Sequence, residues 1–214
     1  MMNAYDKTYL EKARTALGRM LDFAVYELHY ELEKFWELFL TSGVAGRFEI
    51  GDFTVLVGKS GTELAYEVLE KAGLPVNRIT PRYAADRSAE YWTGWALAYF
   101  QWESSLSFSE ITKYVPITQI REMYTPYHEM DIRQFCDEMR KLYKAAKPDT
   151  NLKLLRKSVG LSQQGLAELS GVPTRTIQQY EQRQKNINKA NAEHLLLLSR
   201  ALNCDMAALL ETNE

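Results

Sequence analysis

The chain has 214 residues, of which 46% are hydrophobic, and a formal net charge of -2. This length and apolar content allow a substantial core in one or two domains. Two cysteines, Cys136 and Cys204, are too few for a disulfide framework, and no window approaches 18 apolar residues, so the sequence argues against a disulfide scaffold and a membrane-spanning helix.

The first part of the chain is patterned as helices. Residues 8–42 carry apolar residues at helical spacing and end at a Ser-Gly pair, which predicts one long helix. The apolar run 53–58 is compatible with a short strand. Ser60 is expected to cap the next helix, because Glu63 three residues later completes a capping box, and Gly73 is expected to end it.

An aromatic helix is predicted from Ser88 to about residue 104, with Trp92, Trp95, Tyr99 and Trp102 at helical spacing. This stripe is typical of core packing, although a ligand pocket or a partner surface would use the same residue types. Shorter helices are expected at 108–114 and 117–124, and another begins at Asp131.

The linker prediction falls at residues 144–151, around Pro148. The sequence therefore predicts an all-α chain with a helical domain over residues 1–147 and a second, five-helix domain over residues 148–214. Residues 148–214 carry 8 basic and 7 acidic side chains, against 18 and 21 in residues 1–147. Within 151–200 the balance is 8 basic to 3 acidic, as contact with phosphates requires.

Residues 151–182 have the pattern of two short helices around a tight turn, followed by the rest of a small helical core. Gly160 is expected to end the first helix, Ser162 to cap the second, and Gly171 to make the turn between the second and third. Three sets of apolar residues predict the buried sides of these helices: Leu152, Leu155 and Val159; Leu166, Ala167 and Leu169; and Ile177 and Tyr180.

These residues resemble the lambda-repressor-like, Xre/Cro-type helix-turn-helix family over about residues 151–211. The match is carried in register by Gly160-Leu161-Ser162-Gln163, Leu166-Ala167, Gly171-Val172, Thr176-Ile177 and Glu181. By this resemblance Gln163 contacts phosphate, Thr174, Arg175 and Gln179 read bases, and Arg156 pairs with Glu181 as scaffold. The family usually has Gly two residues after that Glu, where this chain has Arg183.

The sequence therefore predicts a set of DNA-contacting residues on and around the third helix. Their side chains suit base edges and phosphates, since Gln pairs with adenine, Arg with guanine, and Thr with phosphate or a thymine methyl. The predicted set is Gln163, Thr174, Arg175, Thr176, Gln178, Gln179, Gln182 and Arg183.

No catalytic or metal site is expected in the first domain. Gly58-Lys59-Ser60 lacks the Gly that a P-loop needs at position 53, where Phe53 stands. His29, His128 and His194 are scattered without metal-ligand spacing. No nucleophile and base can be assembled, so the sequence predicts neither an enzyme nor a cofactor.

The leading hypothesis is a cytoplasmic, non-enzymatic, sequence-specific transcriptional regulator, most simply a repressor, which binds double-stranded DNA as a homodimer. Its first domain would sense a small-molecule effector or a protein. Parts of residues 20–72 also resemble small helical proteins that accompany bacterial toxins, through positions such as Phe23, Phe39 and Leu64. The alternative is therefore an antitoxin, whose first domain neutralises a toxin and whose second domain autoregulates the operon.

Overall fold

The computed structural model describes residues 3–82 and 87–211. It divides into two compact units, Met1–Lys147 and Pro148–Glu214. Within the described residues every regular element is a helix, so the all-α prediction is confirmed. None of these helices has the length and apolar character needed to cross a bilayer.

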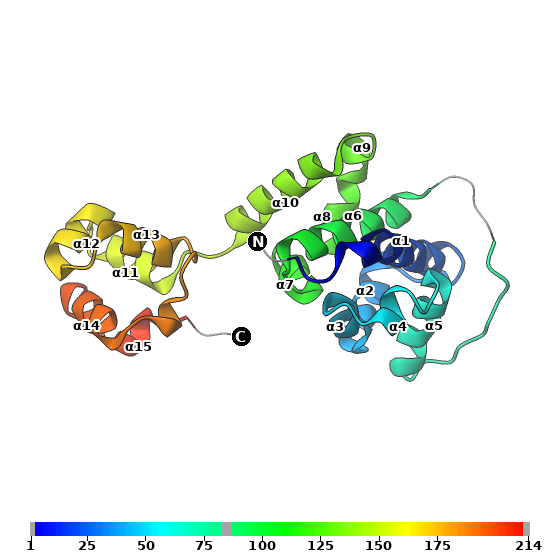
Figure 1. Cartoon of the computed structure of the whole chain (residues 1–214), viewed down its shortest axis with the longest axis horizontal. Helices are drawn as coiled ribbons and strands as arrows, with labels where there is room; N and C mark the ends of the chain where they lie inside the picture. The colour runs from blue at the N-terminus through cyan, green and yellow to red at the C-terminus, as the bar shows by residue number, and fades with distance from the viewer. Residues whose placement is uncertain (1–2, 83–86, 212–214) are drawn as a thin grey trace. The chain divides into compact units, whose positions relative to one another are not determined.

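The N-terminal unit contains a short 3-10 helix and ten α-helices (Figure 1). The elements are η1 (Lys7–Tyr9), α1 (Leu10–Tyr26), α2 (Leu32–Thr41), α3 (Val44–Glu49), α4 (Phe53–Leu56), α5 (Gly61–Lys71), α6 (Ala89–Ser104), α7 (Phe108–Tyr114), α8 (Ile117–Glu122), α9 (Tyr124–Tyr127) and α10 (Ile132–Ala146). The helices predicted from Ser88, at 108–114 and from Asp131 are therefore confirmed, and the segment 117–124 is divided between α8 and α9.

The single helix predicted over residues 8–42 is wrong. The chain breaks between α1 and α2, where His29 adopts a left-handed backbone conformation with φ 57°. The Glu27 carboxylate marks this break: it accepts hydrogen bonds from Arg19 Nη2 at 3.2 Å and from the backbone N–H of Arg82 at 2.8 Å. A contact to a residue far along the chain thus accompanies the break, and helical periodicity carries no signal of it.

The strand considered for residues 53–58 is also wrong, because this segment begins with the short helix α4. Asp52 caps α4 by accepting the Thr54 backbone N–H at 2.9 Å, and the Arg47 guanidinium holds the same carboxylate at 2.8 Å. These hydrogen bonds hold the pKa of Asp52 down at about 2. A polar cap therefore overrides the β-branched character of the run.

The capping box at the start of α5 is confirmed. The Ser60 Oγ accepts the Glu63 N–H at 3.3 Å, and the Glu63 carboxylate accepts the Ser60 N–H at 2.7 Å. Gly73 follows the helix with φ 71°, as expected of a residue that ends a helix.

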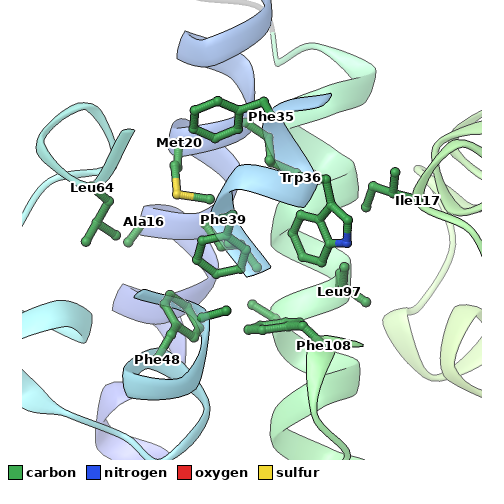
Figure 2. Close-up of a cluster of buried hydrophobic side chains, with 14 of the residues drawn as sticks. Ala16, Met20, Phe35, Trp36, Phe39, Phe48, Leu64, Leu97, Phe108 and Ile117 are labelled. Atoms are coloured by element: carbon green, nitrogen blue, oxygen red, sulfur yellow. The ribbon is translucent and has the colours of Figure 1, made fainter. Parts of the chain in front are cut away.

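The core of the N-terminal unit forms around α1 and α6, which pack along most of their length. Gly18 and Gly94 lie where their backbones are closest: a Cβ on Gly94 would stand 2.5 Å from the Leu17 carbonyl oxygen. Beside this crossing the buried rings of Trp36, Phe39 and Phe108 meet edge-on or tilted, with centroids 5.1–5.6 Å apart (Figure 2). Close backbone approach and aromatic packing therefore hold this unit together.

The aromatic stripe on α6 belongs mainly to this core. Trp92 and Trp102 are buried, and the Trp102 indole N–H donates to the Tyr5 carbonyl at 2.8 Å. Trp95 and Tyr99 are half-buried and lie under the Arg14 guanidinium, which is 3.4 Å from the Trp95 ring centroid. The packing interpretation of the stripe is thus the one the structure supports.

The C-terminal unit has its own apolar core of nine buried residues. Its elements are α11 (Asn151–Ser158), α12 (Gln163–Ser170), α13 (Thr174–Glu181), η2 (Ile187–Lys189), α14 (Ala192–Ala201) and α15 (Met206–Leu209). Leu152, Leu166 and Ile177 are buried as predicted. Val159 and Leu169 are exposed, contrary to prediction, because each is one of the last residues before a glycine turn.

Candidate nucleic-acid interface

A tight glycine turn sets the geometry of α12 and α13. Gly171 adopts φ 75°, and its N–H donates to the Ala167 carbonyl at 2.8 Å, so the chain reverses immediately after α12. Ser162 caps α12 by accepting the Gly165 N–H at 2.9 Å, and Pro173 precedes the first residue of α13. The local residues predicted for this turn therefore make it.

The α13 helix has one buried side and one polar side. Ile177, Tyr180 and Glu181 are buried in the C-terminal unit. The other predicted contact residues of this helix are open to solvent to different degrees: Arg175, Gln178 and Gln182 are exposed, and Thr174, Thr176 and Gln179 are half-buried. The polar side of α13 thus brings six of the eight predicted residues together on and just after one short helix.

A buried ion pair fixes this helix to α11. Arg156 Nε and Nη2 donate to the two carboxylate oxygens of Glu181 at 2.6 and 2.9 Å, and Arg156 Nη1 donates to the Leu161 carbonyl at 2.7 Å. Hydrogen bonding to Glu181 raises the pKa of Arg156. The scaffold pair implied by the family resemblance is therefore confirmed.

Gln163 differs from the other predicted contacts because its side chain has a partner inside the unit. Its Nε2 donates to Glu181 Oε2 at 2.6 Å. Gln163 therefore supports the same carboxylate that positions α13, from the N-terminal residue of α12. Its amide oxygen is the remaining side-chain group for an outside ligand.

Arg183 also has internal partners. Its backbone is left-handed, with φ 54°, directly after the C-cap of α13, which explains why glycine suits this position in related domains. Its Nε donates to Glu211 Oε2 and its Nη1 to the Pro148 carbonyl, both at 2.9 Å. These contacts engage Arg183 in the structure of the unit itself.

The remaining basic side chains divide into paired and unpaired groups. Lys153 and Lys157 both bind the Asp149 carboxylate, at 2.6 and 2.8 Å. Within the described part of the chain, four basic residues of this unit make no ion pair: Arg175, Lys185, Lys189 and Arg200. Three of the four lie on α13 or in the segment up to η2, which places unneutralised positive charge beside the polar helix face.

Lys185 and Lys189 are absent from the predicted contact residues. The sequence does hold a signal for them, since they contribute to the basic excess within 151–200. The structure adds that both are exposed and that no carboxylate neutralises them among the residues it describes.

Asp149 is expected to make the C-terminal unit sensitive to acid. Hydrogen bonds from Lys153 and then Lys157 hold its pKa down at about 2. A carboxyl with a lowered pKa contributes stability above its unfolded pKa, which is about 3.9, and loses it as pH falls toward the folded value. Hydrogen exchange of α11 should therefore accelerate between about pH 4 and pH 2. Asp149→Asn should remove that acid dependence, and an unchanged profile in this variant would contradict it.

No group of three or more metal-ligating side chains is found in residues 3–82 and 87–211. Tyr180 Oη lies 3.3 Å from His194 Nδ1. His128 Nδ1 instead contacts the Tyr124 carbonyl at 2.9 Å. The arrangement in the C-terminal unit suits hydrogen bonding and charge contact with a nucleic acid.

Residues 152–209 match a family model described as helix-turn-helix. No curated protein and no solved structure gives a match. The matched range spans α11 to α15, and the family is a DNA-binding, regulatory one, so the lambda-repressor-like resemblance is confirmed for this unit.

Proposed function

Because residues 152–209 form a lambda-repressor-like helix-turn-helix domain, we propose that this chain is a cytoplasmic, sequence-specific transcriptional repressor that binds as a homodimer. The observation that supports it is the α13 face, where Arg175, Gln178 and Gln179 stand beside unpaired Lys185 and Lys189. This arrangement separates groups that read bases from groups that meet phosphates.

In this proposal α13 enters the major groove. Arg175 and Gln179 carry the base contacts, with Thr174, Thr176, Gln178 and Gln182 around them. Lys185 and Lys189 meet the phosphate backbone after the helix ends, and Gln163 does so from the start of α12. Arg183 acts instead on the domain's own structure, through Glu211 and Pro148.

The homodimer follows from the size of the reading surface. One α13 covers only a few base pairs, and useful affinity in such domains comes from two half-sites about 34–36 Å apart. The DNA site is therefore expected to be two-fold symmetric.

Selection of bound duplexes from a random pool tests the proposal directly. The full chain is expected to enrich a two-fold symmetric sequence at a stated salt concentration. Enrichment of a single asymmetric site would count against the dimer. A pool with no enriched sequence would count against specific DNA binding as a whole.

Substitutions on α13 should separate reading from anchoring. Arg175→Ala and Gln179→Ala are each expected to cost about 1–3 kcal/mol of binding and to relax the preference at particular base positions. Gln163→Ala and Lys189→Ala should weaken binding to all sequences alike. Competition binding with the selected site and single-base variants measures both effects.

The matched control is Arg200→Ala, which removes the same charge from α14 instead of α13. It is expected to leave base preference unchanged. If Arg175→Ala and Arg200→Ala had the same effect on every duplex, α13 would not be the reading helix.

A role for the N-terminal unit in binding a partner protein supports the second candidate function, an antitoxin that also regulates its own operon. The observation that favours it is the exposure of three large apolar side chains in one short segment, Ile50, Phe53 and Val57. Co-purification of a tightly bound second protein that is released on α4 substitution would support this role.

A further inference from the structure

The N-terminal unit presents an apolar strip beside an open cleft. Ile50, Phe53 and Val57 are exposed by 76, 66 and 41% and follow one another at spacings of three and four residues across the end of α3 and α4. Phe53 and Val57 are one helical turn apart, because the Val57 N–H donates to the Phe53 carbonyl at 3.0 Å. Large apolar side chains gathered in this way are typical of an interaction surface.

The strip continues into the cleft through Val57, which also lines it. The cleft has a volume of about 620 Å³ and lies between α1 and the segment joining α4 to α5. Buried Ala16 and Leu56 contribute apolar lining, and Lys12, Thr15 and Lys59 contribute polar groups. Its size and mixed lining suit an apolar anchor side chain that carries polar neighbours.

The ion pairs around this surface have a consistent direction, with the cation outermost. Lys59 is 33% exposed and Arg47 38%, whereas Glu67, which binds both, is 11% exposed. In the same way, Arg19 is more exposed than Asp22, to which it is bonded at 2.5 Å. Lys12 adds an exposed cation for which the described residues hold no carboxylate partner. The surface therefore offers ammonium and guanidinium donors above buried carboxylates.

We propose that this cleft and the strip of Ile50, Phe53 and Val57 bind an amphipathic helix of a partner protein, whose apolar face is edged by Asp or Glu side chains. The spacing of the strip matches a helix lying across it, with anchors at successive turns. The acidic edge is specified by the outward cations, although the unit as a whole carries 21 acidic and 18 basic residues. This proposal rests on the partner-binding role of the N-terminal unit and is independent of the DNA-reading residues.

The test is a selection of binders for the full-length protein from a displayed library of helical peptides with randomised outward positions. The expected result is a set of peptides with apolar residues at helical spacing and flanking Asp or Glu. A synthetic copy of one selected peptide should bind more weakly as salt rises. Its charge-reversed twin, with Lys in place of each acidic residue, should bind at least about tenfold more weakly.

Two variants locate the binding. Phe53→Ser should weaken the selected peptide by about tenfold or more, and Lys12→Glu should weaken the acidic peptide while relieving the loss for its charge-reversed twin. Met130→Ser, at an exposed apolar residue of α9–α10, and Lys144→Glu are the matched controls and should leave binding unchanged. Circular dichroism checks that each variant keeps its helices.

Several results would overturn the proposal: no enriched peptide, enriched peptides without acidic residues, or binding that is unaffected by Phe53→Ser. Conversion of a dimer to a monomer by Phe53→Ser would assign the strip to self-association instead. Competition by a DNA duplex for the peptide site would assign the cations to nucleic acid. Operator binding by Phe53→Ser is measured alongside, so that failure of the DNA-binding function is distinguished from failure of this surface.

Discussion

Replacing Arg156 with methionine should lower the free energy of unfolding of the C-terminal unit by about 3–5 kcal/mol, the usual cost of leaving one member of a buried ion pair alone. Glu181 would remain buried with only Gln163 as a side-chain donor, and the Leu161 carbonyl would lose its guanidinium partner. The effect should also reach DNA binding, because Glu181 is the last residue of α13.

The measurement is hydrogen exchange of the full chain, read in peptides from residues 151–209. Tryptophan fluorescence is blind to this unit, since all four tryptophans lie within residues 1–147. The double variant Arg156→Met with Glu181→Leu is the control: removing both charges should restore much of the lost protection. A double variant as unstable as the sum of the two single ones would show that the pair itself is not the cause.

Replacing Gly94 with alanine should destabilise the N-terminal unit by about 3 kcal/mol, at the upper end of the usual cost of overpacking. The added Cβ would meet the Leu17 carbonyl oxygen at 2.5 Å, the Leu17 carbonyl carbon at 2.7 Å and the Gly18 Cα at 2.9 Å. All three are backbone atoms of α1, so relief requires α1 and α6 to move apart and to open the core between them.

Denaturant unfolding followed by tryptophan fluorescence measures this change, since three of the tryptophans lie on α6. Gly46→Ala is the matched control, because Gly46 is an exposed helical glycine with nothing within 4 Å of its added Cβ. That variant should be neutral or stabilised by about 0.5–1 kcal/mol. Equal effects at the two glycines would mean that helix propensity, and not the α1–α6 crossing, governs both.

Sequence could predict those elements whose cause is local. Ser60 with Glu63, and Gly171 after α12, act through their own backbone neighbours, so the residue types alone reveal the turn. The Arg156–Glu181 pair was accessible through family resemblance, since the two residues are far apart in sequence. The same holds for the polar face of α13, whose contact residues remain predictions of DNA binding.

Sequence could not predict features that depend on a distant contact. The break after α1 coincides with the contact between Glu27 and Arg82, and α4 is fixed by Asp52 under Arg47. Periodicity instead favoured a continuous helix in the first case and a strand in the second. Leu169 has the spacing of a core residue, but the turn at Gly171 leaves it in solvent. In each place tertiary geometry prevails over local pattern.

Glu211 joins three parts of the C-terminal unit at once. Its carboxylate accepts the Arg183 guanidinium at 2.9 Å and the Asn151 N–H at 3.3 Å, and its own backbone N–H and C=O bond the Asn188 side chain at 2.8 and 2.6 Å. The start of α11, the end of α13 and η2 are therefore closed by a residue outside every helix. Fusions and truncations have a sharp limit here: a chain cut before Glu211 keeps every DNA-contacting residue proposed above, yet loses the link that holds their supports together.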